Sequence, residues 1–88
     1  MLHFPLILMN QEYLELTDIY AAAFLISQGV QLEGTERSSD GRVRFILRRT
    51  EGMDELLQAY WSNSPVSAVP AQLYSSLKYL KSLIHSRP

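Results

Sequence analysis

The sequence lacks several of the residues on which enzymes and cross-linked domains depend. It contains no cysteine, which excludes disulfides, thiolate metal ligands and a thiol nucleophile. Its two histidines, His3 and His85, lie at opposite ends of the chain, and neither has a carboxylate near it in sequence that could orient it as a base. No phosphate-binding loop, dinucleotide-binding glycine pattern, zinc-protease motif or nucleophile elbow occurs. We therefore expect a protein that is not an enzyme and that takes no cofactor or small-molecule substrate.

Long hydrophobic runs are missing as well. The longest, residues 4–9 and 19–26, fall far short of the ~20 residues of a membrane helix. The first of them is about as apolar as a signal-peptide core, but it has no basic flank and no small-residue cleavage site. These features predict a cytoplasmic protein without a membrane partner.

The chain is small, and its core is correspondingly limited. Its 88 residues are 47% hydrophobic and 19% charged, which is typical of one folded domain. A domain of this size buries only roughly 60–65% of its unfolded surface, so small domains often gain stability from disulfides, metals or association. Because disulfides are excluded, we expect either an unusually apolar core or self-association.

Charge is arranged in blocks along the sequence, although the net charge is only −1. Residues 1–36 hold five acids and no lysine or arginine, whereas residues 37–49 hold five arginines and one acid. Residues 50–63 are again acidic, and residues 64–88 hold three cations and no acid. Such blocks can pair within the fold or across a dimer, and they can also create a local basic patch on a neutral protein.

Residues 1–12 form an apolar arm ahead of a domain that we place at residues 13–88. Leu2, Phe4, Leu6 and Leu8 alternate with residues that are mostly apolar too, so an extended arm has two apolar faces. One interpretation is an edge strand, which Pro5 would suit, and the other is an extension outside the domain. An ordered apolar arm has to lie against another surface.

The first predicted helix is apolar on every side. Thr17 is the expected N-cap, residues 19–26 continue the helix, and Gly29 ends it. A helix of this kind is normally buried on several sides, which is difficult within one small subunit. We therefore predict a homodimer that uses the arm and this helix, with plain core packing as the alternative. The candidate interface residues are Leu2, Phe4, Leu6, Leu8, Tyr20 and Phe24.

The rest of the chain predicts a β-hairpin followed by two helices. Asp-Gly at residues 40–41 is a strong hairpin-turn signal, and a two-residue turn there would pair Glu33 with Arg48 and Arg37 with Arg44. An amphipathic pattern over residues 53–62 predicts the second helix, and Pro70 begins a third that runs to about residue 85. An extra short strand is expected from the arm or from residues 66–69. The predicted fold class is therefore α+β, in the order helix, hairpin, helix, helix.

Several short segments carry a resemblance to a known family. They are T-D-I-Y-A-A-A-F-L at residues 17–25, Glu36-Arg37, G-R-V-R-F at residues 41–45, Tyr60-Trp61 and Leu80-Lys81. The chain resembles, over roughly residues 13–85, a family of small bacterial and phage domains of unknown function. The resemblance implies a stand-alone α+β domain from bacteria, phages or mobile elements, and it implies no activity. The arm before Met9 departs from the family pattern.

An arginine-rich hairpin face is the main candidate site. Arg42, Arg44 and Arg48 share the strand face opposite Val43, Phe45 and Leu47. The full candidate set is Arg37, Arg42, Arg44, Arg48, Lys78 and Lys81, which together could bind phosphates or carboxylates. The alternative is a solvated face with weak ion pairs. We expect a non-enzymatic, self-associating accessory or interaction module, or alternatively a nucleic-acid-binding protein of phage or mobile-element type.

Overall fold

The computed structural model describes residues 12–85 of the chain. Its elements, in chain order, are β1 (Tyr13–Leu16), α2 (Ile19–Ser27), β2 (Leu32–Arg37), β3 (Val43–Arg48), α3 (Met53–Trp61) and α4 (Pro70–His85). The predicted α+β class is confirmed. The predicted hairpin and both later helices are present, and their ends lie within about two residues of those expected.

The three strands form one antiparallel sheet in the order β1-β3-β2. The strand β3 lies in the centre of the sheet. Its residues alternate between a face toward the helices, where Phe45 and Leu47 are fully buried, and an outer face that carries arginines. An extra strand is present as β1, which begins just after the predicted arm and pairs Leu16 with Phe45 and Tyr13 with Arg48. The alternative position was wrong, since residues 66–69 form no strand. The arm at residues 1–11 lies outside the described residues.

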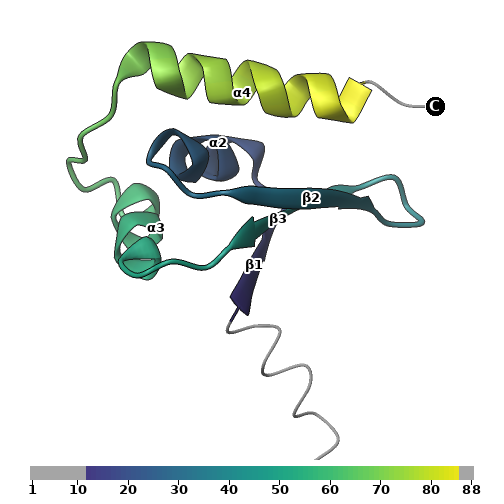
Figure 1. Cartoon of the computed structure of the whole chain (residues 1–88), viewed down its shortest axis with the longest axis horizontal. Helices are drawn as coiled ribbons and strands as arrows, with labels where there is room; N and C mark the ends of the chain where they lie inside the picture. The colour runs from purple at the N-terminus through teal and green to yellow at the C-terminus, as the bar shows by residue number, and fades with distance from the viewer. Residues whose placement is uncertain (1–11, 86–88) are drawn as a thin grey trace, which may run out of the picture.

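The apolar helix α2 is the centre of the fold. Figure 1 shows it in the space between the sheet and α4, with α3 to one side. Its residues Ala21, Ala22, Ala23, Phe24 and Leu25 are each no more than 2% exposed. The absence of a polar face therefore reflects enclosure by elements of the same chain. The sequence indicated that one small subunit would cover this helix only with difficulty, and two helices and a sheet of the same chain cover most of it.

The ends of α2 follow local hydrogen-bonding rules. The N-cap is Asp18 rather than the predicted Thr17, and its Oδ1 accepts hydrogen bonds from the backbone N–H groups of Tyr20 (2.9 Å) and Ala21 (3.2 Å). Thr and Asp are both good N-cap residues, and because the helix begins at Ile19 the capping position falls on Asp18. At the other end Gly29 has a φ of +104°, as expected of the residue that ends a helix.

The hairpin register differs by one residue from the prediction. The N–H of Ser38 donates to the carbonyl of Arg42 (2.8 Å), and Gly41 adopts a φ of +89°. The loop therefore has three residues, a turn followed by a left-handed glycine, in place of the two-residue turn that was assumed. As a result Glu36 lies opposite Arg44, and Arg37 lies opposite Val43. An irregularity between Leu32 and Gly34 shifts the remaining pairs.

The helix α4 covers α2 on the side away from the sheet (Figure 1). Its fully buried residue is Leu80, and Leu73, Leu77, Leu83 and Ile84 pack beside it. Its C-terminal end is tied to the hairpin, because Arg37 Nη2 donates to the carbonyl oxygen of Ile84 at 3.1 Å. Arg37 thereby satisfies one of the carbonyls that every helix leaves free in its last turn.

Substitutions on the buried face of the sheet should lower the free energy of unfolding more than substitutions on its polar face. We expect Phe45→Ala and Leu80→Ala each to lower the free energy of unfolding by ~2–5 kcal/mol, because both side chains are fully buried. Leu77→Ala should cost less than Leu80→Ala, since Leu77 is only partly buried. Arg44→Ala should cost less than about 1 kcal/mol, as a substitution on the polar face. Urea denaturation gives the ranking, and an Arg44 variant less stable than the Phe45 variant would contradict the strand faces.

The bond from Arg37 to α4 should control fraying of that helix. Removing it with Arg37→Ala is expected to speed hydrogen exchange of the last-turn amides of α4 by roughly fivefold, which corresponds to one hydrogen bond of ordinary strength. Arg42→Ala is the matched control, because Arg42 is an exposed arginine of the same turn with no bond to α4. Equal exchange rates in the two variants would show that the contact contributes nothing.

Candidate interaction surfaces

The outer face of the sheet carries arginines that are already paired. Arg44, on the central strand, lies between two neighbours: its guanidinium is 3.7 Å from Glu15 of β1 and 3.9 Å from Glu36 of β2. Its Nε is buried and has no hydrogen-bond partner. All three side chains are roughly half exposed, so each pair contributes little to stability. The pairs nevertheless neutralise the charge of Arg44.

Arg48 is also paired on this face. Its Nε donates a 2.8 Å hydrogen bond to Glu33, and its Nη2 lies 3.3 Å from the hydroxyl of Tyr13. The guanidinium carbon is 5.2 Å from the centre of the Tyr13 ring. The hydrogen bond and charge of Glu33 raise the pKa of Arg48. The predicted Glu33–Arg48 contact is present, although the turn that was expected to produce it has a different length.

This face therefore holds three glutamates and two arginines. It has more negative than positive charge, which does not favour a phosphate backbone. The expected single basic site is not assembled. Arg37 points to the helix side of the sheet, where it contacts α4. Lys78 and Lys81 lie on α4, which packs against α2 on the helix side of the sheet and not on the outer face (Figure 1).

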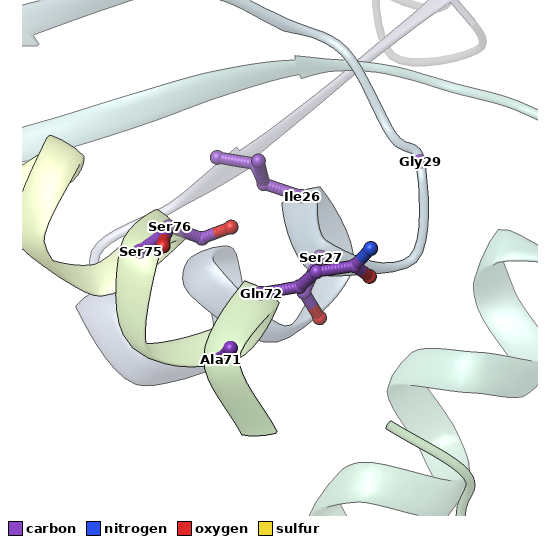
Figure 2. A pocket seen from close by; sticks show the side chains of 7 residues that line it. All are labelled: Ile26, Ser27, Gly29, Ala71, Gln72, Ser75 and Ser76. Carbon is purple, nitrogen blue, oxygen red and sulfur yellow. The ribbon is translucent and has the colours of Figure 1, made fainter. Parts of the chain in front are cut away.

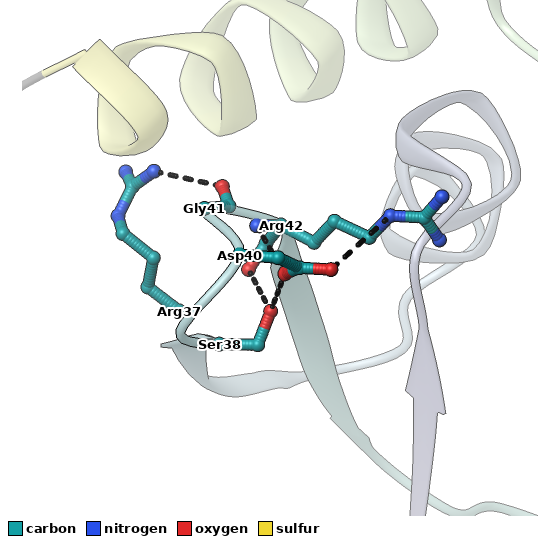
Figure 3. A network of polar contacts seen from close by, with 5 residues as sticks. All are labelled: Arg37, Ser38, Asp40, Gly41 and Arg42. Carbon is teal, nitrogen blue, oxygen red and sulfur yellow. Dashed lines mark hydrogen bonds and ion pairs between the residues drawn. The ribbon is translucent and has the colours of Figure 1, made fainter.

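The hairpin turn is held by its own polar network (Figure 3). Asp40 accepts hydrogen bonds from the Ser38 hydroxyl and from the Arg42 N–H, and these two bonds lower the pKa of its carboxyl. The Arg42 guanidinium lies 3.9 Å from the same carboxylate and points away from Arg37. Arg37 Nη1 donates to the carbonyl of Gly41 at 3.2 Å. The turn thus pairs Arg42 with a carboxylate and Arg37 with carbonyls alone.

The candidate dimer residues are not on one surface. Phe24 is 2% exposed, and its ring stacks on Tyr60 with a centroid distance of 5.3 Å. Its place in the core excludes it from a contact between folded chains. Tyr20, in contrast, is 56% exposed. Leu2, Phe4, Leu6 and Leu8 lie outside the described residues.

An aromatic patch lies at the end of α3. We use this name for Tyr20, Tyr60, Trp61 and Val66. Tyr60, Trp61 and Val66 line a hollow of about 440 Å³, together with Asn63 and Ser64. Trp61 is 54% exposed. Tyr20 lies one helical turn before Phe24, whose ring stacks on Tyr60, so Tyr20 is on the side of α2 that faces α3. Burial raises the pKa of Tyr60, and the nearby Asp18 and Tyr20 raise it further. Tyr20 is far from the other three residues in sequence, and the packing of α2 against α3 brings it near them.

A second hollow lies between the C-terminal end of α2 and the first turns of α4. Figure 2 shows its lining, which is uncharged; the residues are Ile26, Ser27, Gly29, Ala71, Gln72, Ser75 and Ser76. Its volume is about 430 Å³, and a neighbouring hollow of about 330 Å³ shares Ser27 and Gln72 with it. The side chain of Gln28 donates a 2.8 Å hydrogen bond from Nε2 to the carbonyl of Ser67, which lies in the loop before α4. The lining offers hydroxyl and amide hydrogen bonds and no titratable side chain.

The described part of the chain, residues 12–85, contains neither a candidate metal site nor a candidate membrane helix. No three histidine, aspartate or glutamate side chains gather closely enough there to hold a metal ion. None of the helices in this part of the chain has the length and hydrophobicity needed to cross a membrane.

Comparison with known proteins places the chain in a family. No curated protein and no solved structure matches it significantly. A family model matches residues 11–86, which is nearly the whole chain and includes every element described above. The expected membership of a small-domain family of unknown function is therefore confirmed: the chain belongs to the family described as domain of unknown function DUF5659.

Proposed function

We propose that the protein is a non-enzymatic interaction module that self-associates through the aromatic patch. The observation that carries the proposal is the exposure of Trp61 beside the hollow at the end of α3. Isolated exposed apolar side chains are common on monomers, but a tryptophan grouped with a tyrosine and a valine around a concave surface, with the exposed Tyr20 on the neighbouring helix, is typical of a contact site. As part of the same proposal, the protein is cytoplasmic and of bacterial or phage origin.

The composition of the patch suits a protein partner. Tyrosine and tryptophan supply large apolar area with few rotatable bonds, and they are enriched among the residues that dominate binding energy. The chain also contains the apolar segment at residues 2–9, in which His3 is the one polar residue. A second copy brings a second patch and a second apolar segment, so the two features supply both sides of a symmetric contact.

The aromatic patch replaces the face that was expected from the sequence. The predicted interface used α2, and the enclosure of α2 leaves Tyr20 as its one strongly exposed aromatic residue. Tyr20 lies at the start of the helix, on the side where α3 ends. The proposed contact is therefore formed by the first turn of α2, the end of α3 and the loop that follows α3.

Sedimentation velocity over a micromolar concentration series tests self-association. The wild-type protein should sediment as a dimer, and Trp61→Ala should weaken the dimer by roughly thirtyfold, as expected when a side chain worth about 2 kcal/mol is removed. Tyr20→Ala should weaken it in the same direction. A wild-type protein that remains monomeric at high micromolar concentration would contradict the proposal.

Tyr79→Ala is the matched control for Tyr20→Ala. The two tyrosines have similar exposures, 56% for Tyr20 and 52% for Tyr79, but Tyr79 lies on α4 and not in the patch. The control should leave the association constant unchanged. If the Tyr79 variant weakens the dimer as much as the Tyr20 variant does, the contact does not lie at the aromatic patch.

A further inference from the structure

The negative charges of this protein are confined to the first part of the chain. Glu55 is its last acidic residue, and residues 56–88 contain none. The helix α4 falls entirely within this acid-free part and carries Lys78 and Lys81. Neither lysine forms an ion pair with any of the residues 12–85. The positive charges of these two lysines are therefore not compensated by any carboxylate of the described residues.

The exposed cations of α4 share one face with an aromatic ring. Tyr74, Lys78, Lys81 and His85 are spaced four, three and four residues apart, which aligns them along the solvent side of the helix. We call this set the basic stripe. The buried Leu80 lies on the opposite side, against α2. The Nζ of Lys78 is 5.5 Å from the centre of the Tyr74 ring, so a cation and an exposed ring are already in contact.

The hairpin turn adds a third uncompensated cation at the end of the stripe. The guanidinium of Arg37 is bonded to the carbonyls of Gly41 and Ile84, and no carboxylate of residues 12–85 forms an ion pair with it. Its bond to Ile84 holds it beside the last turn of α4, which contains His85; Lys81 lies one turn earlier in the helix. Figure 3 shows the Arg37 guanidinium directed toward α4. Arg42, in the same turn, is paired with Asp40 and directed away.

We infer that the basic stripe, together with Arg37, binds single-stranded nucleic acid through its phosphate backbone. Lysine and arginine bind phosphates, and the exposed Tyr74 at the first end of the stripe can stack on an unpaired base. The stripe extends over about 16 Å of helix, which is the length of two or three nucleotides of an extended strand. The ring favours a single strand over a duplex, because duplex bases are already stacked on one another. This inference is independent of self-association, which uses a different surface.

The basic stripe should bind anions better than the outer face of the sheet does. On the outer sheet face each arginine has a glutamate at 2.8–3.9 Å, so incoming phosphates would meet carboxylates there. On α4 they would meet ammonium groups and rings. The six basic residues selected from the sequence thus divide into two groups. Arg42, Arg44 and Arg48 each lie beside a carboxylate, whereas Arg37, Lys78 and Lys81 form no ion pair within residues 12–85.

Fluorescence anisotropy with a labelled oligothymidylate tests the inference at low salt. Wild-type protein should bind, and its log–log salt dependence should have a slope of roughly −2, the value for about three phosphate contacts on a single strand. Lys78→Gln/Lys81→Gln should weaken binding by roughly tenfold or more. Tyr74→Ala should weaken binding to the single strand severalfold and leave weak binding to duplex DNA unchanged.

Arg44→Gln/Arg48→Gln is the matched control, because it removes the same two positive charges from the outer sheet face. It should bind oligothymidylate as the wild type does, with folding of both variants checked by circular dichroism. Equal loss in the two double variants would overturn the inference, as would a wild-type protein that binds no oligothymidylate at low salt. Tighter binding to polyglutamate than to oligothymidylate would assign the stripe to an acidic protein instead. The lysine variant should sediment as the wild type does, which separates this test from that of self-association.

Discussion

The enclosure of α2 is the constraint on which the rest of the structure depends. A helix with three successive alanines followed by phenylalanine and leucine has no side that tolerates water, so each neighbouring element has to supply an apolar surface to it. The sheet supplies Phe45 and Leu47, α3 supplies Leu57, and α4 supplies Leu80. The small side chains of the alanines let these layers approach closely, which gives a short chain a core on several sides of one helix.

This arrangement also sorts the charged residues. The sheet turns one face to α2, so the polar residues of its strands are forced onto the other face, where glutamates of the edge strands meet arginines of β3. The helix α4 lies on the other side of α2 and belongs to a part of the sequence without acids, and its lysines form no ion pair within residues 12–85. One face of the molecule is consequently neutralised and the opposite one is basic, although the net charge is only −1.

Local signals in the sequence predicted most elements but not how they meet. Gly29 and Pro70 marked helix ends correctly, because their effect is confined to a few residues of backbone. The hairpin register failed by one residue, since Asp40-Gly41 fits both a two-residue loop and a three-residue loop with Gly41 in the left-handed conformation. Phe24 was assigned to an interface because its helix is apolar, and periodicity alone does not reveal whether its cover comes from the same chain.

The same reasoning explains the outcome for the candidate site. Alternation along β3 placed Arg44 and Arg48 on one face correctly, but the two partners of Arg44, Glu15 and Glu36, depend on strand order and register. The grouping of Tyr20 with Trp61 depends on the packing of two helices, and no spacing in the sequence encodes it. Residue type and period therefore identify which side chains are exposed, whereas pairing and neutralisation require the three-dimensional arrangement.

Hydrogen exchange of the α2 amides at two protein concentrations, one above and one below the dissociation of any dimer, tests the enclosure of α2 most directly. Because elements of the same chain cover the helix, the account predicts that the amides of residues 22–27 exchange only through global unfolding of the single chain. In the dilute monomer their protection should still match the full free energy of unfolding of the single chain, and a dimer at the higher concentration adds only its own binding free energy. Exchange in the dilute monomer that is faster than its global unfolding allows would contradict the account, since it would show that a partner chain supplies the cover of this helix.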